Sequence, residues 1–290
     1  MTSRLAASSR IEPSPLAKIE PTPAAIEIRN LRRVFLPRNG VAVEALGGIS
    51  LTVRQSEVVA VLGPSGCGKS SLLRILAGLD TEFTGDTVWK LENADVDTTR
   101  RLRSATVFQS DSTFPWLNVE KNIKIGLSGL ALDKAEATNR ILRYLGLVGL
   151  GKFRTAYPHE LSGGMRQRVA IARALATEPL LLLMDEPLAA LDAQTRLVMQ
   201  QELLRIWKQT KSTVIYITHD IGEALTLADR VVVMTARPGR IKAIQDVPFG
   251  RDRDAIQIHA DPEFGQLESE LWRLVAEEVG HTLETSNGDA

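Results

Sequence analysis

A glycine-rich segment that follows an apolar run has the composition of an anion-binding loop. The loop reads Gly63-Pro64-Ser65-Gly66-Cys67-Gly68-Lys69-Ser70, and the apolar run before it is Val58–Leu62. Backbone N–H groups in such a loop point inward, and the helix that follows adds its partial positive charge. Glycine at positions 66 and 68 lets the backbone approach phosphate groups without a Cβ in the way. These residues, together with Ser71, are therefore predicted to bind the phosphates of a nucleotide.

Three side chains of this loop have separate predicted roles. A lysine at the position of Lys69 reaches the β- and γ-phosphates, and a hydroxyl at the position of Ser70 ligates Mg²⁺. Cys67 is the single cysteine of the chain, so it has no second cysteine to resolve an oxidised thiol. We assign it a packing role in the nucleotide site. The strand–loop–helix order is typical of the P-loop of nucleotide-hydrolysing proteins.

A second apolar run ends in two carboxylates. Leu180–Met184 is followed directly by Asp185 and Glu186. An apolar parallel strand places Asp185 at the carboxyl edge of the sheet, where it can hold Mg²⁺ through water. Glu186 is then placed to orient or deprotonate a water that attacks the γ-phosphate. The alternative, a buried strand with a solvated turn, is disfavoured because a P-loop precedes it.

These motifs need a sheet and helices to position them, and the hydrophobic pattern predicts both. Short continuous apolar runs favour the strands of a parallel sheet with helices on both faces. The expected strands are 58–62, 180–184, 214–217 and 231–234, and the expected helices are 166–176, 194–209 and 221–227. Residues from about 110 to 165 carry few strand signals and are predicted as a helical subdomain, with helices at 119–125 and 134–147.

The chain divides into three predicted parts. Residues 1–25 are rich in Ser, Ala and Pro and are expected to form a disordered tail. Residues 26–250 are expected to form an α/β domain that hydrolyses a nucleotide. Residues 251–290 are expected to form an amphipathic helix over 261–279 and a frayed tail.

Composition restricts the classes of partner. Lys+Arg and Asp+Glu both number 35 in the 290 residues, so the net charge is zero. Nucleic-acid-binding proteins carry a basic excess or a basic stripe, so no nucleic-acid partner is expected. No run approaches the about 20 apolar residues that span a bilayer. Any role at a membrane is therefore expected to be peripheral.

A third motif connects the chain to a known family. The segment Leu161-Ser162-Gly163-Gly164-Met165-Arg166-Gln167-Arg168 resembles the signature motif of ATP-binding cassette (ABC) proteins. Ser162, Gly163 and Gly164 would form an anion site at a helix N-terminus. The resemblance implies a RecA-like, mainly parallel sheet core, an antiparallel β subdomain and the inserted helical subdomain. It also implies that two copies, or this chain and a close homologue, dimerise head to tail, with the signature of one covering ATP on the P-loop of the other.

The resemblance assigns two more residues to the reacting end of the nucleotide. Gln109 resembles the Q-loop glutamine, which contacts Mg²⁺ and the attacking water. His219 resembles the switch histidine, which contacts the γ-phosphate. With Lys69 and Glu186, these residues form the expected catalytic set.

Two assignments lie farther from the reaction. Asp192 resembles the D-loop aspartate, which communicates across the dimer and is expected at the nucleotide. The family often has a serine where this chain has Ala189 or Ala190, so no side-chain bond is expected there. Phe35 lies where the family places an aromatic ring that stacks on adenine; alternatively it is a core residue.

The resemblance is sharpest toward importers of nitrate, sulfonates and taurine. It rests on Phe114–Val119, Leu191–Arg196, Ala228–Val231 and Ala236–Ile241. It implies transmembrane permease partners, an extracytoplasmic solute-binding protein, and a place at the cytoplasmic face of the membrane. An exposed aromatic cluster at 114–117 would receive a permease helix; alternatively, it packs the helical subdomain.

Other ABC systems remain as alternatives. An exporter or lipid-release ATPase would use the same catalytic residues, and so would a soluble ABC ATPase that acts on ribosomes or DNA. Ribosome-acting members usually carry two cassettes in one chain, and DNA-repair members insert a long coiled coil. This sequence shows neither feature.

Overall fold

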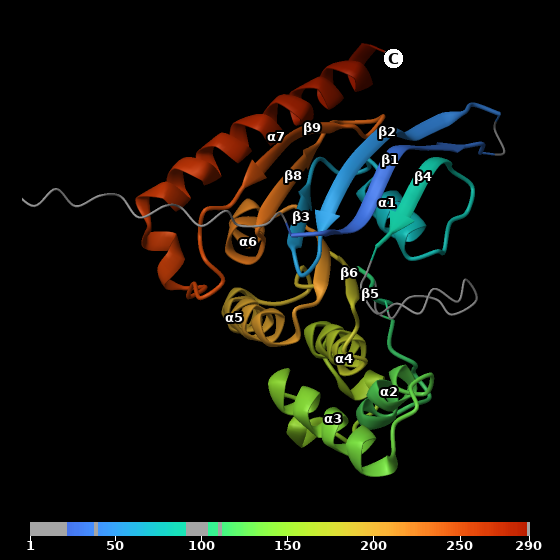
Figure 1. Ribbon diagram of the computed structural model, residues 1–290, viewed down its shortest axis with the longest axis vertical. Helices are drawn as coiled ribbons and strands as arrows, with labels where there is room; N and C mark the ends of the chain where they lie inside the picture. Colours follow the sequence, from blue (N-terminus) through green and yellow to red (C-terminus); the bar gives the residue numbers. More distant parts are fainter. Residues whose placement is uncertain (1–21, 38–39, 91–103, 110–111, 289–290) are drawn as a thin grey trace, which may run out of the picture.

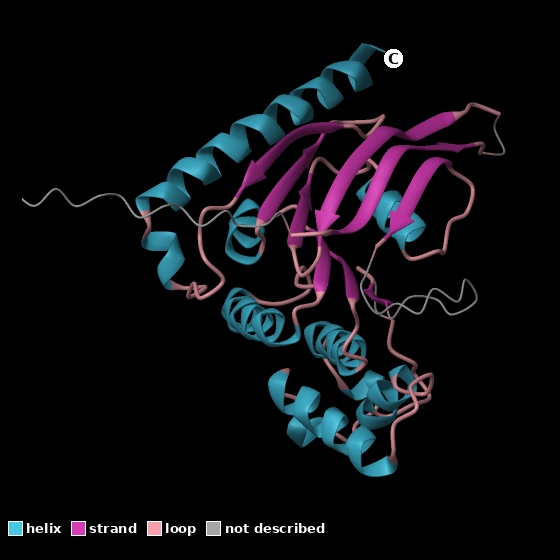
Figure 2. Cartoon of the chain, in the orientation of Figure 1, coloured by secondary structure: helices cyan, strands magenta, loops and turns pink. Residues whose placement is uncertain are grey.

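Two β-sheets and a set of helices make up the part of the chain that can be described. The computed structural model describes residues 22–37, 40–90, 104–109 and 112–288. The larger sheet lies at the centre of the view, the smaller sheet lies beside it, and several helices gather at the lower end (Figures 1 and 2). The predicted tail, residues 1–25, lies outside the described residues as far as residue 21.

The larger sheet has the predicted parallel strands. Within the described residues its order is β5-β6-β7-β3-β8-β9. Neighbouring strands are parallel except β8 and β9, which are antiparallel. Every residue of β3, β6 and β7 is buried, as expected for strands covered on both faces. The bounds are β3 Val58–Leu62, β5 Ser104–Val107, β6 Leu181–Asp185, β7 Thr213–Ile217, β8 Arg230–Met234 and β9 Ile241–Asp246.

The helices between these strands begin close to the predicted positions. They are α1 Lys69–Leu76, α4 Gly163–Ala176, α5 Ala193–Thr210 and α6 Ile221–Leu227. Helix α4 begins three residues earlier than predicted, because Ser162 caps its N-terminus. The phosphate-binding loop and the Asp185–Glu186 pair therefore lie where strands of the larger sheet end, and the signature segment lies where α4 begins.

The smaller sheet is antiparallel, with the order β2-β1-β4. Its strands are β1 Ala24–Phe35, β2 Val43–Arg54 and β4 Thr84–Trp89. Strand β1 begins inside the predicted tail, and the Ala25 side chain is buried. The domain boundary predicted between residues 25 and 26 is therefore two residues too late. The predicted fold class, an α/β fold with a parallel sheet and an antiparallel β subdomain, is confirmed.

A group of helices lies between β5 and β6 in the sequence. It contains α2 Val119–Gly126 and α3 Lys134–Leu147, with short 3₁₀ turns η1 Gly151–Phe153 and η2 Pro158–Glu160. Asn118 and Asp133 cap α2 and α3 by accepting hydrogen bonds from backbone N–H groups. Both helices match the predicted positions. The start of the predicted subdomain, residues 110 and 111, lies outside the described residues.

The chain ends in a helix that is longer than predicted. Helix α7, Pro262–Gly288, continues past residue 279 and includes most of the predicted frayed tail. It lies beside β8, β9 and α6 (Figure 1). Three apolar residues of this amphipathic helix, Phe264, Leu267 and Leu271, are buried. No helix of the described residues is both long and apolar enough to cross a membrane.

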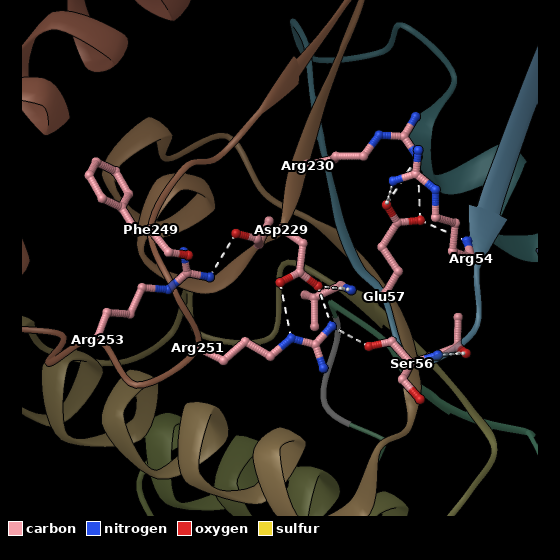
Figure 3. Close-up of polar contacts among 11 residues, drawn as sticks. Arg54, Ser56, Glu57, Asp229, Arg230, Phe249, Arg251 and Arg253 are labelled. Carbon is pink, nitrogen blue, oxygen red and sulfur yellow. Dashed lines mark hydrogen bonds and ion pairs between the residues drawn. The ribbon is translucent and has the colours of Figure 1, made fainter. Parts of the chain in front are cut away.

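Polar contacts fasten the segment between β9 and α7 to the start of the parallel strands (Figure 3). Arg251 donates to both carboxylate oxygens of Asp229, which also accepts from the Val58 N–H. Arg253 donates to the Ala228 carbonyl at 2.7 Å. These contacts lie at the amino ends of β3 and β8, away from the phosphate-binding loop. They hold the segment that leads through the 3₁₀ turn η3, Gln257–Ala260, into α7.

Candidate active site

The glycine-rich loop joins β3 to α1 and wraps around a lysine. Gly66 and Gly68 have φ angles of 75° and 104°, a region that favours glycine. The Lys69 ammonium donates to the carbonyl oxygens of Gly63 at 2.7 Å and Pro64 at 2.9 Å. No side chain caps the N-terminus of α1. The loop therefore presents a cation and a helix N-terminus together, as an anion site requires.

Cys67 is buried beneath this loop. Burial raises the pKa of its thiol, while Lys69 opposes the shift. A protonated thiol in this position fits the packing role that the sequence predicts.

Asp185 and Ser70 meet at the carboxyl end of β6. The Asp185 side chain is buried, and the Ser70 side chain lies near enough to its carboxylate to act on its pKa. Burial raises the pKa of Asp185, and Ser70 opposes this shift. A hydroxyl and a carboxylate next to a phosphate-binding loop are the oxygen donors that Mg²⁺ prefers. These two residues therefore fit a magnesium site completed by substrate oxygens.

Glu186 brings two other predicted residues together. Its Oε2 accepts a hydrogen bond from Gln109 Nε2 at 2.9 Å and lies 3.2 Å from His219 Nδ1. The Glu186 backbone has a φ of 44°, and its N–H donates to the Ile217 carbonyl at 2.9 Å. A left-handed conformation costs a non-glycine residue on the order of 1–2 kcal/mol. The bond to β7 holds this conformation, and the three side chains converge from three separate segments.

A cavity of about 390 Å³ connects this cluster to the glycine-rich loop. Phe35 and Val43, which face each other across the β1–β2 pair, lie at its edge. Phe35 is 38% exposed, which does not fit the alternative that it is a core residue. The Arg33 guanidinium lies 4.2 Å from the centre of that ring. The residues that line the cavity are Phe35, Val43, Ala45, Ser65, Gly66, Gly68, Lys69, Ser70, Ser71, Gln109, Glu186 and Arg237.

Arg237 is the charged residue of this cavity that the sequence analysis did not place there. It lies between β8 and β9, and its Nε and Nη2 atoms donate to the Gly66 carbonyl at 3.3 and 3.1 Å. An Arg-Pro-Gly turn between two apolar strands was the available signal. That signal does not show which loop the arginine contacts.

The signature residues and Asp192 do not line this cavity. Ser162 caps α4, with its hydroxyl 3.2 Å from the Met165 N–H, and Gly163 and Gly164 form the first turn. Asp192 caps α5, and the hydrogen bonds from Thr195 lower its pKa. One chain therefore brings together the loop, the paired acids, Gln109 and His219, and leaves the signature elsewhere.

The aromatic pair after Gln109 is divided between packing and exposure. Trp116 is 70% exposed, and its ring centre lies 5.6 Å from that of Phe114. The Arg173 guanidinium on α4 lies 5.2 Å from the Phe114 ring centre. Phe114 thus packs toward the helical part of the chain, while Trp116 faces outward.

Several known proteins are similar to this chain in sequence. The family model described as ABC transporter matches residues 46–189. An ABC transporter ATP-binding protein of Methanocaldococcus jannaschii, named as uncharacterized, is 45% identical and covers 89% of this chain and 94% of its own length. The taurine import ATP-binding protein of Roseobacter denitrificans is 41% identical, with coverages of 86% and 93%. An aliphatic sulfonates import ATP-binding protein of Bacillus cereus is 42% identical, with coverages of 79% and 90%.

Solved structures have the same fold. The dimeric structure of a post-hydrolysis state of the ATP-binding cassette MJ0796, bound to ADP and Pi, has a TM-score of 0.67 and 30% identity. It covers 78% of this chain and 100% of that chain. A second dimeric structure of the same cassette has a TM-score of 0.68 and 31% identity.

Proposed function

This chain belongs to the ABC transporter family and is an ATP-binding, ATP-hydrolysing subunit, and on that premise we propose that it serves an importer of a small anionic solute. The solute class is that of nitrate, sulfonates and taurine. Relatives that are 41% and 42% identical are named as taurine and aliphatic sulfonates import proteins. Those names support the branch, and the exposed Trp116 supports a protein partner beside Gln109.

One observation carries the catalytic part of the proposal. Lys69, the Ser70–Asp185 pair and the Glu186–Gln109–His219 cluster all lie at or beside one cavity. Lys69 and the loop N–H groups bind the β- and γ-phosphates, and Phe35 stacks on the adenine at the edge of the cavity. The same residues thus hold both ends of the nucleotide.

Glu186 is the proposed general base. It accepts a proton from the water that attacks the γ-phosphate, while Gln109 and His219 orient its carboxylate and the water. Ser70 and Asp185 are the residues that would hold Mg²⁺, which when bound neutralises charge on the phosphate oxygens. Lys69 and His219 stabilise the charge that develops on the transferred phosphoryl group.

The active unit is proposed to be a head-to-tail dimer of two copies or of this chain and a close homologue. Each chain has one anion site at α1 and a second at α4, and only the first lies in the cavity. The residues proposed to reach the partner's nucleotide are Ser162, Gly163, Gly164 and Asp192. The solved cassettes of this fold are dimers, which supports this arrangement.

The proposed partners follow from the importer assignment. Phe114 and Trp116, which follow Gln109 in the sequence, form the contact surface for a cytoplasmic helix of the permease. The chain would then lie at the cytoplasmic face of the membrane, and the solute-binding protein would contact the permease on the other side. No nucleic acid takes part in this proposal.

The test is to purify the complex from native membranes in mild detergent and to identify its components by mass spectrometry. We expect a multi-span permease, and a binding protein whose addition with taurine, an alkanesulfonate or nitrate stimulates ATP hydrolysis of the complex in liposomes. If a solute on the cytoplasmic side stimulated ATP hydrolysis without a binding protein, the complex would be an exporter and not an importer. Recovery of only ribosomal or DNA-repair proteins would overturn the transport assignment and leave the ATPase assignment intact.

A further inference from the structure

The turn between β8 and β9, residues 235–240, contacts both the phosphate-binding loop and the smaller sheet. Arg237 donates from Nε and Nη2 to the Gly66 carbonyl. The Gly239 N–H donates to the Ala45 carbonyl at 3.0 Å, and the Gly47 N–H donates to the Gly239 carbonyl at 2.9 Å. We call residues 235–240 the β8–β9 turn. It is joined to β2 on one side and to the loop on the other.

A second contact between the turn and the loop depends on the lack of a side chain. A Cβ added to Gly239 would lie 2.1 Å from the Cys67 carbonyl oxygen and 3.2 Å from that of Ala45. Because real Cβ atoms do not approach oxygen so closely, any other residue would displace the loop or the turn. The carbonyls of Gly66 and Cys67, two successive residues, therefore both face the β8–β9 turn.

This arrangement decides where two N–H groups of the loop point. In a planar trans peptide the C=O and the N–H point in opposite directions. Holding the Gly66 and Cys67 carbonyls toward the turn directs the N–H groups of Cys67 and Gly68 away from it. Inside the loop, the Cys67 N–H donates a long hydrogen bond of 3.4 Å to the Pro64 carbonyl. Inward-pointing N–H groups are what an anion-binding nest consists of.

Helix α7 also contacts the turn, through the side chain of Glu278. Glu278 is buried, and its Oε2 accepts a hydrogen bond at 2.9 Å from the N–H of Ala236, the residue before Arg237. Its Oε1 lies 2.7 Å from the Lys242 ammonium on β9. A buried carboxylate of the C-terminal helix thus fixes the position from which Arg237 extends.

We propose that Arg237 and Glu278 are positioning residues for nucleotide binding, so that α7 controls the ATP affinity of the phosphate-binding loop through the β8–β9 turn. Glu278 holds the turn, Arg237 donates to the Gly66 carbonyl, and Gly239 leaves room for the Cys67 carbonyl beside the turn. The inference rests on the proposed nucleotide site and adds the C-terminal helix to it.

The test uses the purified full chain and a non-hydrolysable ATP analogue with Mg²⁺, titrated by calorimetry. Arg237→Ala and Glu278→Ala are each expected to raise the Kd by about 3- to 10-fold, because each removes hydrogen bonds that keep the loop in its binding geometry. Glu278→Gln keeps an acceptor for the Ala236 N–H and should recover most of the affinity. Thermal unfolding of each variant shows that the folded protein is being titrated.

The matched control is Glu277→Ala. Glu277 lies on the same turn of α7 as Glu278, and its side chain is 44% exposed and pairs with Lys242 and Arg273. The Ala236 N–H donates to Glu278 and not to Glu277. A Kd within twofold of wild type is expected for this variant. An equal loss of affinity in Glu277→Ala and Glu278→Ala would show a general effect of α7 and would overturn the specific route through Ala236.

A double variant tests whether the two residues act in one path. If Glu278 acts through Arg237, the losses in Arg237→Ala and Glu278→Ala combine to less than their product. Fully multiplicative losses, or wild-type affinity in either single variant, overturn the inference. Lys69→Ala separates this outcome from failure of the site itself: its normal binding of the analogue would overturn the proposed nucleotide site.

Discussion

Helices α1 and α4 both begin at glycine-rich sequences that we propose as phosphate-binding, but only one of the two N-termini has a side-chain cap. No side chain caps α1, and its first residue, Lys69, lines the cavity. The N-terminus of α4 is capped by Ser162, and it lies outside the cavity. At α1, the loop, the lysine and the acidic residues of the proposed nucleotide site all come from one chain. The N-terminus of α4 lies outside the cavity in which the same chain would bind its nucleotide.

This difference gives the dimer a physical role. A nucleotide can bind to the α1 site of a single chain, because the loop, the cation and the paired acids are already together. In the proposed dimer, charge at the γ-phosphate gains the second helix N-terminus only when another chain supplies it. Binding and turnover should therefore separate in variants, according to which helix end is altered.

The largest expected effect is on turnover, in Glu186→Gln. Removing the general base should lower kcat by on the order of 10²–10⁴-fold while the amide keeps contact with Gln109 and His219. Because ATP remains bound and intact between α1 of one chain and α4 of the other, the variant should elute as a dimer in the presence of ATP. Steady-state hydrolysis and size-exclusion chromatography measure both. Turnover near the wild-type rate would remove Glu186 from this role.

The next largest effect is on binding, in Lys69→Ala. Loss of a buried cation that contacts phosphates should weaken ATP binding by about 2–5 kcal/mol, or roughly 30-fold or more. Calorimetric titration of the variant against wild type measures this, and the exposed Lys134→Ala on α3 serves as the control. Normal ATP binding by Lys69→Ala would contradict the claim that one chain alone forms the nucleotide site at α1.

Features made of contiguous residues could be predicted from the sequence, whereas contacts between distant segments could not. The loop and the Asp185–Glu186 pair are each contiguous, and local backbone geometry places their functional groups, so residue order alone located them. Arg237 was missed because its contact with Gly66 spans 171 positions. The strands of the smaller sheet were not placed individually, since bulges interrupt the register of β1 and obscure its alternation. The length of α7 was underestimated because the sequence after residue 279 contains few apolar residues from which a helical period could be read.

A smaller effect is expected at the other helix end, in Ser162→Ala. Loss of the N-cap should cost about 1 kcal/mol of stability and lower turnover several-fold, while the ATP Kd of the single chain stays unchanged. Asp133→Ala is the matched control, because Asp133 caps α3 through a similar bond to the Glu136 N–H at 2.8 Å. The control should lose similar stability without loss of turnover. A weaker Kd in Ser162→Ala would mean that α4 contributes to the site of its own chain.

The smallest effects concern pH, and they have opposite signs for two aspartates. Burial raises the pKa of Asp185 in the folded chain above its ordinary value of 3.8. The unfolded chain therefore releases this proton at a lower pH than the folded chain does, and ionisation of Asp185 at higher pH favours the unfolded state. Asp185→Asn should therefore raise the Tm of the nucleotide-free chain at pH 7.5, with a gain that shrinks toward pH 4.

Hydrogen bonds from Thr195 lower the pKa of Asp192, whose ionised form stabilises the fold and loses that contribution as the pH falls. Asp192→Asn should lower the Tm at pH 7.5 only slightly, because asparagine is also a good N-cap. Thermal unfolding across this pH range measures both, and equal signs for the two variants would contradict the contrast between a buried carboxylate and an exposed helix cap.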